Sequence, residues 1–144
     1  APIFIVVEPN NADCLFQSAV NGKPTMVHGD LDTVMAGLAC GEVSVLAWKI
    51  LQDHISHYLT IEDSCVAKTM QLLANNRPAI VAGESAVAGL AGFLIASQDD
   101  DLRSKLKLTK DSRVLVFGTE GDTDEDMYKN MVGRSASEVL AENN

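Results

Sequence analysis

The chain has 144 residues, of which 47% are hydrophobic and 22% charged, so it can form one packed domain and its composition excludes intrinsic disorder. Its formal net charge of -9 argues against a nucleic-acid-binding or anionic-membrane surface, because clustered Lys and Arg side chains bind polyanions. The longest apolar run, residues 86–96, is well short of the roughly 20 residues that a transmembrane helix needs, so we expect no membrane segment.

Cysteine and histidine spacing gives no sign of a disulfide framework or a metal site. The three cysteines, Cys14, Cys40 and Cys65, are odd in number and form no C-x-x-C pair, so neither a stapled secreted fold nor a structural zinc site is indicated. His54 and His57 are three residues apart but have no third ligand beside them. We therefore predict a cytoplasmic protein without a bound metal.

The acidic segment D-T-D-E-D, residues 122–126, spaces its carboxylates as an EF-hand loop does. A calcium loop also needs Gly at its sixth position and Glu at its twelfth. Counted from Asp122, these positions are Met127 and Gly133. The segment is therefore interpreted as a capping cluster at a helix N-terminus, where the helix dipole stabilises negative charge.

The N-terminal half alternates short apolar runs with helical patterns. Residues 3–7 are rich in β-branched side chains and are followed by Glu8-Pro9, which is typical of a buried parallel strand. Asn11 is placed to cap a helix that Gly22 ends. The further elements expected here are a strand at residues 25–27, a small-residue helix at 34–40, an amphipathic helix at 42–55 and a strand at 58–61.

The C-terminal half continues this alternation. Asp63 or Ser64 can begin a helix whose inner face carries Val66, Met70 and Leu73. The elements expected after it are a brief strand at residues 79–81, an apolar helix at 86–96, a short helix at 102–106, a strand at 114–117, a helix with Met127, Tyr128 and Met131 inward, and a last helix opened by the capping box Ser135–Glu138.

Strands that alternate with helices predict an α/β fold, with a layered α/β/α domain and a mainly parallel sheet. We expect one domain over residues 1–144, with residues 134–144 as a polar tail. In such sheets, ligands bind beyond the carboxyl ends of the strands. Glu8-Pro9, the turn at residues 29–33 and the loop G-T-E-G-D-T-D at 118–124 are all expected there.

Motifs that would identify a catalytic centre are absent. The glycines of G-E-S-A-V-A-G-L-A-G, residues 83–92, fit neither the dinucleotide fingerprint nor the phosphate-binding P-loop. No G-x-S-x-G nucleophile elbow occurs, and no cysteine stands beside a histidine. We therefore assign no catalytic residue to this chain.

Five segments together carry a resemblance to a known family. They are V-E-P-N-N-A-D-C-L-F-Q-S, G-D-L-D-T-V-M-A-G-L-A-C-G-E, A-W-K-I-L, G-E-S-A and T-E-G-D-T-D, at residues 7–18, 29–42, 47–51, 83–86 and 119–124. In this order they resemble the diaminopropionate ammonia-lyases, which are fold type II pyridoxal-phosphate enzymes related to tryptophan synthase β and threonine deaminase.

The resemblance implies that the chain is the C-terminal portion of a longer, two-domain enzyme. In the family, the lysine that binds pyridoxal 5'-phosphate and the glycine-rich phosphate loop lie upstream of the V-E-P segment. None of the lysines here stands in the family's lysine context, so the missing N-terminal part of the same protein is the expected partner. The abrupt apolar start A-P-I-F-I-V-V agrees with a chain cut inside a longer protein.

By the same resemblance, three pairs of residues should line the cofactor. They are Ala36 and Gly37, Glu84 and Ser85, and Gly118 and Thr119. The first pair would approach the reactive side of the cofactor, where only a small side chain leaves room for the backbone. The second would lie near the pyridine ring and the third near its nitrogen. Relatives have Ser where this chain has Gly118, which leaves Thr119 as the nearest hydroxyl.

The implied activity is the α,β-elimination of 2,3-diaminopropionate, an amino acid substrate, to pyruvate and ammonia, with this piece inactive by itself. Two alternatives stay open: a non-catalytic α/β binding or interaction domain, and a related fold type II lyase or dehydratase such as threonine deaminase. Unpaired sheet edges recruit other chains, so we also expect a homo-oligomer, most simply a dimer.

Overall fold

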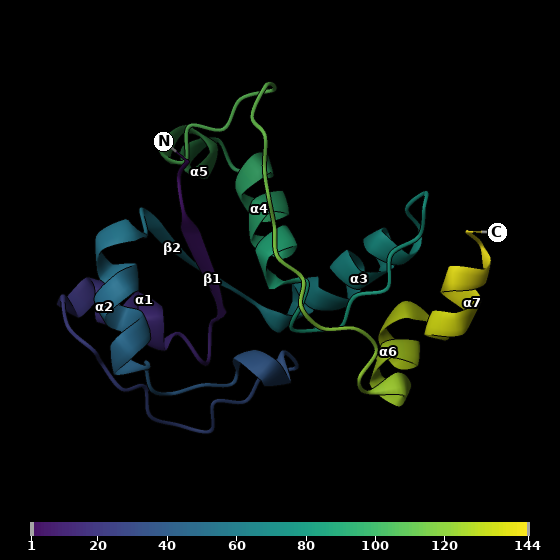
Figure 1. Cartoon of the computed structure of the whole chain (residues 1–144), viewed down its shortest axis with the longest axis horizontal. Helices are drawn as coiled ribbons and strands as arrows, with labels where there is room; N and C mark the ends of the chain where they lie inside the picture. Colours follow the sequence, from purple (N-terminus) through teal and green to yellow (C-terminus); the bar gives the residue numbers. More distant parts are fainter. Residues whose placement is uncertain (1, 144) are drawn as a thin grey trace.

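The computed structural model describes residues 2–143 and has the predicted mixed α/β character (Figure 1). Its elements in chain order are β1 (Ile5–Pro9), α1 (Cys14–Asn21), the 3-10 turn η1 (Ala36–Leu38), α2 (Val45–His54), β2 (His57–Ile61), the 3-10 turn η2 (Asp63–Cys65), α3 (Val66–Ala74), α4 (Ala88–Gln98), α5 (Asp100–Lys105), α6 (Glu125–Val132) and α7 (Ala136–Ala141).

The sheet of the described chain has two parallel strands. β1 pairs with β2 in a register that places Ile5 opposite His57 and Pro9 opposite Ile61. Parallel strands need a long crossover connection, and here the crossover contains α1, η1 and α2. Both α1 and α4 pack against the strands. The prediction of a parallel α/β sheet is therefore confirmed.

Three predicted strands do not form among the described residues. Residues 25–27, 79–81 and 114–117 lie outside every strand. At residues 25–27, the N–H of Val27 donates to the carbonyl oxygen of Gly41 (2.8 Å), which is a single bond without a ladder. Leu115 is 78% exposed. The reason is the same in each case: a strand requires a neighbouring strand, and no described segment supplies one.

The predicted helix at residues 34–40 is reduced to the single turn η1 (Ala36–Leu38). The Asp63 side chain accepts hydrogen bonds from the Thr33 hydroxyl (2.6 Å) and the Val34 N–H (2.8 Å). These contacts tie the segment to η2 before a helix can begin, and they leave Met35 fully buried below it. Propensity alone could not reveal this tertiary constraint.

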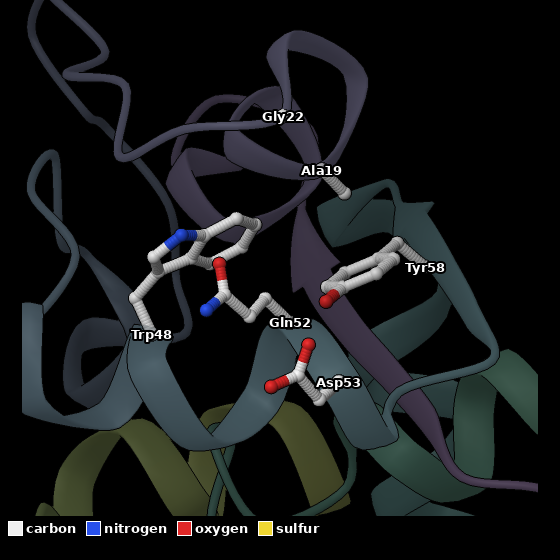
Figure 2. Close-up of a pocket in the computed structure, with 6 residues that line it drawn as sticks. All are labelled: Ala19, Gly22, Trp48, Gln52, Asp53 and Tyr58. Carbon is white, nitrogen blue, oxygen red and sulfur yellow. The ribbon is translucent and has the colours of Figure 1, made fainter.

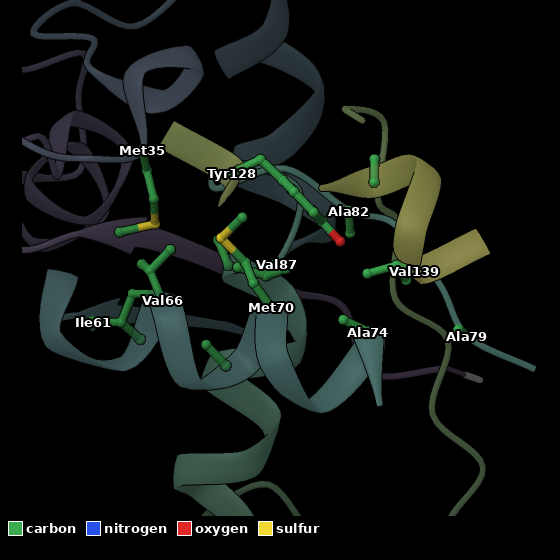
Figure 3. Close-up of a cluster of buried hydrophobic side chains, with 13 residues drawn as sticks. Met35, Ile61, Val66, Met70, Ala74, Ala79, Ala82, Val87, Tyr128 and Val139 are labelled. Carbon is green, nitrogen blue, oxygen red and sulfur yellow. The ribbon is translucent and has the colours of Figure 1, made fainter. Parts of the chain in front are cut away.

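The main core lies between α3, α6, α7 and the segment before α4 (Figure 3). Met70 and Val66 project from α3 toward Met35 and Val87, and each of these side chains is at most 1% exposed. Leu73, the third predicted inner residue of α3, packs at the edge of this core. The inner face predicted for α3 is therefore confirmed.

The C-terminal residues are anchored by specific contacts. The capping box is present, since the Ser135 hydroxyl and the Glu138 side chain each bond to the other residue's backbone. Val139 of α7 is fully buried. The Asn143 side-chain amide exchanges two hydrogen bonds with the backbone of Ala79 (2.6 and 2.9 Å). The predicted last helix is confirmed.

Helix α4 approaches β1 through a glycine, which gives a test of the packing. A Cβ at Gly92 would lie 2.8 Å from Val7 Cγ2, whereas one at Gly89 would lie 3.8 Å from Val116. We expect Gly92→Ala to lower the free energy of unfolding by about 1 kcal/mol, because overpacking of ~1–3 kcal/mol exceeds the helix gain. Gly89→Ala, the matched control, should raise it by about 0.5–1 kcal/mol. Equal effects in urea unfolding would contradict this packing.

None of the helices within residues 2–143 is long and apolar enough to span a bilayer.

Candidate cofactor site

The three segments that the sequence assigns to one site lie together in the structure. The Gly37 N–H donates to Ser85 Oγ (2.9 Å), and the Ser85 N–H donates to Glu120 Oε2 (2.8 Å). The Gly83 N–H donates to the carbonyl oxygen of Glu120 (3.0 Å). Residues 36–38, 83–86 and 118–121, far apart in sequence, therefore form one connected constellation.

Two glycines of this constellation, Gly83 and Gly37, are packed tightly against other site residues. A Cβ at Gly83 would collide with the carbonyl oxygen of Gly121 and lie 2.7 Å from Glu120 Oε2. A Cβ at Gly37 would lie 3.0 Å from Ser85 Oγ. Gly83 and Gly37 therefore allow the site segments to approach one another closely.

The other predicted residues differ in burial. Glu84 is 5% exposed, and its carboxylate makes no hydrogen bond to another described residue. Ala36, Gly37, Gly118 and Thr119 are exposed. The Thr119 hydroxyl has no hydrogen-bond partner within residues 2–143. The backbone edges and this hydroxyl are therefore open to a ligand.

An apolar cavity of about 220 Å³ adjoins these segments. The residues around it come from α3, α4, segment 80–82, Val116 and the site segments: Leu73, Ile80, Val81, Ala82, Ala86, Leu90, Val116, Gly118 and Glu120. Because Ala86, Gly118 and Glu120 line it, it forms a groove that is continuous with the site.

A second cavity, of about 330 Å³, lies elsewhere, between α1, α2 and β2 (Figure 2). Its walls are Ala19, Gly22, Trp48, Gln52, Asp53 and Tyr58. None of these residues belongs to the predicted site, and their side chains come from elements far from residues 118–121 in sequence. Among residues 2–143, no three His, Cys, Asp or Glu side chains are placed to share a metal ion.

Glu8, at the predicted carboxyl end of β1, holds the start of α1 rather than a ligand. Its carboxylate accepts the N–H groups of Leu15 (3.0 Å) and Phe16 (2.8 Å). Burial raises the pKa of Glu8, while these two backbone donors oppose the rise. Asn11, the predicted helix cap, instead donates to the carbonyl oxygen of Asp32 (2.8 Å). The prediction that Asn11 caps α1 is therefore wrong, since Asp13 stands at the N-cap.

The nearby thiol of Cys14 is unsuited to chemistry. It is 4% exposed, and burial together with the Glu8 carboxylate raises the pKa of Cys14 to about 11. Nucleophilic attack requires the thiolate, which is scarce at neutral pH when the pKa is that high.

The parallel α/β sheet and the three converging segments are typical of an enzyme with a ligand site at the ends of its strands. Comparison with known proteins shows the family. The chain belongs to the family of pyridoxal-phosphate dependent enzymes, which matches residues 1–120. The cofactor of this family is pyridoxal phosphate.

Within that family, the chain is 45% identical over 135 residues to a diaminopropionate ammonia-lyase of Escherichia coli (strain K12), a match covering 89% of this chain and 34% of that protein. It is 42% identical over 147 residues to the diaminopropionate ammonia-lyase of Salmonella typhimurium (strain LT2), covering 94% and 36%. The chain therefore spans about a third of the length of the curated relatives it matches.

Solved structures agree with this placement. The E. coli diaminopropionate ammonia-lyase in complex with an aminoacrylate-PLP azomethine reaction intermediate matches with a TM-score of 0.78 and 40% identity, over 89% of this chain and 33% of that one. A serine racemase of Dictyostelium discoideum matches with a TM-score of 0.67 and 19% identity, over 85% and 36%. The second match supports the fold alone.

Proposed function

We propose that this chain is the C-terminal portion of a pyridoxal-phosphate-dependent ammonia-lyase. The full enzyme would eliminate the β-amino group of 2,3-diaminopropionate as ammonia, and hydrolysis of the product by water would give pyruvate and a second ammonia, in the cytoplasm and as a step of amino acid breakdown. The observation that carries the proposal is the convergence of residues 36–38, 83–86 and 118–121 in a chain that is 45% identical to an ammonia-lyase.

The residues present fit one side of a flat aromatic cofactor. Gly37 and Gly118 are exposed, so their backbone is accessible to a ring. The side of each glycine where a Cβ would stand is occupied by Ser85 and Ala86, so these glycines let the site segments pack together. Thr119 offers the ring nitrogen a hydroxyl that has no partner within residues 2–143. Glu84 and Ser85 would complete the wall beside the ring.

When bound, pyridoxal phosphate accepts the electrons released as the substrate loses its α-proton. The chain's own residues orient and enclose it. The neutral Thr119 hydroxyl would hydrogen-bond the ring nitrogen without fixing a positive charge there, which favours elimination over transamination. The apolar groove beside Ala86 and Val116 would exclude water from one face of the site.

The remaining parts of the site would come from other polypeptide. The family's cofactor-binding lysine and phosphate loop have no counterpart in this chain, so we propose that the N-terminal part of the same protein supplies them. Residues 113–119 make no hydrogen bond through their backbone to any described residue, and Leu115 and Phe117 are each 78% exposed. Such an edge suits a strand added by that part or by a second copy in a dimer.

Enzyme assays on the full-length polypeptide test this function. We expect pyruvate release from 2,3-diaminopropionate in the presence of pyridoxal phosphate, with far lower rates on threonine and serine. The 144-residue chain alone should release none. Faster turnover of threonine than of 2,3-diaminopropionate would indicate a dehydratase and not a diaminopropionate ammonia-lyase. A full-length protein without activity on all three substrates would refute the proposal.

A further inference from the structure

We infer that Glu120 is a positioning residue, which aligns the Ser85 and Gly37 sides of the cofactor site through its carboxylate. This inference deepens the proposed function and rests on it for its catalytic meaning. Its structural content, however, can be measured without any cofactor. Glu120 lies in the motif T-E-G-D-T-D, whose periodicity and spacing do not distinguish it from the other acidic residues there.

Glu120 holds the turn at residues 83–85 at two points. Its backbone carbonyl accepts the Gly83 N–H (3.0 Å), and its carboxylate Oε2 accepts the Ser85 N–H (2.8 Å). The missing side chain of Gly83 makes this possible, since a Cβ there would lie 2.7 Å from the same carboxylate oxygen. Two bonds from one residue fix both the position and the orientation of the turn.

The contact continues to the third segment of the site. The Ser85 side chain, oriented by its own N–H bond to Glu120, accepts the Gly37 N–H at Oγ (2.9 Å). The other carboxylate oxygen, Oε1, lies 3.9 Å from where a Cβ of Gly37 would stand. The Glu120 carboxylate is therefore packed between the two segments that would meet the cofactor, and it acts on Gly37 through Ser85.

The carboxylate of Glu120 is bound by a backbone N–H and not by a basic side chain. Among residues 2–143, no Lys, Arg or His forms a salt bridge with Glu120. Its partner N–H at Ser85 belongs to the turn that leads into α4. The neighbouring Asp124 has a different role, since it caps α6 by accepting the Met127 N–H (2.9 Å).

Amide hydrogen exchange, followed by NMR on the 144-residue chain, tests this inference residue by residue. In Glu120→Ala, we expect exchange at Ser85 to be about 10- to 100-fold faster, because a charge-assisted hydrogen bond is lost. Exchange at Gly37 should be faster as well. Gly83 should be unchanged, because its acceptor is the backbone carbonyl, and Glu120→Gln should restore Ser85 to within about tenfold, because an amide oxygen still accepts.

The matched control is Glu125→Ala, which removes an exposed carboxylate at the start of α6 and should leave all three amides unchanged. Unchanged exchange at Ser85 in Glu120→Ala would overturn the inference. Faster exchange at Gly83 as well would also overturn the inference, because the Glu120 side chain would then be needed for the folding of the whole loop and not for the alignment of Ser85 and Gly37 alone.

A cofactor titration of the full-length protein separates this inference from the proposed function. Glu120→Ala should weaken pyridoxal phosphate binding and shift its absorbance, and Glu120→Gln should largely restore both. If the unmodified full-length protein binds no cofactor, the proposed function fails whatever Ser85 does. If it binds and Glu120→Ala binds equally well with an unchanged spectrum, the positioning role is refuted.

Discussion

Gly83→Ala in the full-length protein is expected to weaken pyridoxal phosphate binding by about 10- to 100-fold, from an overpacking cost of ~1–3 kcal/mol. The added methyl group would meet the backbone carbonyl of Gly121 and the carboxylate of Glu120. A backbone atom cannot rotate away as a flexible side chain can. The turn must therefore separate from the loop at residues 118–121. Absorbance titration with the cofactor measures the effect.

Gly121→Ala is the matched control for this change. Gly121 is adjacent in space, but a Cβ there would meet nothing within 4 Å, and its backbone does not require glycine. Cofactor binding in this variant should equal that of the unmodified protein. If the two variants weakened binding to the same extent, the loss could not be assigned to the close contact at Gly83.

Glu8→Ala is expected to lower the free energy of unfolding by about 2–4 kcal/mol, because two backbone N–H groups at the start of α1 lose their acceptor and each costs ~1–3 kcal/mol. The donors are Leu15 (3.0 Å) and Phe16 (2.8 Å). Asp13, at the N-cap of α1, makes no capping bond that could substitute. Urea unfolding of the chain measures the loss, and a value below ~0.5 kcal/mol would show that water replaces Glu8.

The same carboxylate makes stability depend on pH. Because burial raises the pKa of Glu8 above its ordinary value of 4.5, the folded state binds more protons than the unfolded state once the pH exceeds that value. The free energy of unfolding should therefore fall as the pH rises from about 4.5 through the folded-state pKa. Glu8→Gln keeps an acceptor but cannot ionise, so its decline over this range should be smaller. Identical slopes would contradict a raised pKa.

Local patterns were sufficient for elements that pack through their own periodic faces. Helices α2 and α3 and strands β1 and β2 all form where the sequence predicts them, with boundaries shifted by a few residues. Residues 114–117 are as apolar as β1, yet they form no strand within residues 2–143 because pairing depends on a neighbour. A strand pattern therefore indicates that a segment can form a strand, but whether it does so depends on a neighbouring strand with which it can pair.

The candidate site was predictable in its segments but not in its connections. Motif resemblance identified residues 36–37, 84–85 and 118–119, and the structure brings these segments together. Glu120 was missed because its bond to Ser85 spans 35 residues. Neither periodicity nor capping rules report a contact of that range. The reason is physical. A glycine in the sequence already indicates that the backbone can be approached closely, whereas the Glu120–Ser85 hydrogen bond exists only in the folded chain.

The central claim is that residues 36–37, 84–85 and 118–119 form one wall of the cofactor site. Hydrogen exchange of the full-length protein, measured by mass spectrometry with and without pyridoxal phosphate, tests it most directly. We predict slower exchange in peptides that cover these three segments, with no change around the cavity of Trp48 and Tyr58. Cofactor binding that leaves all three segments unprotected would contradict the account.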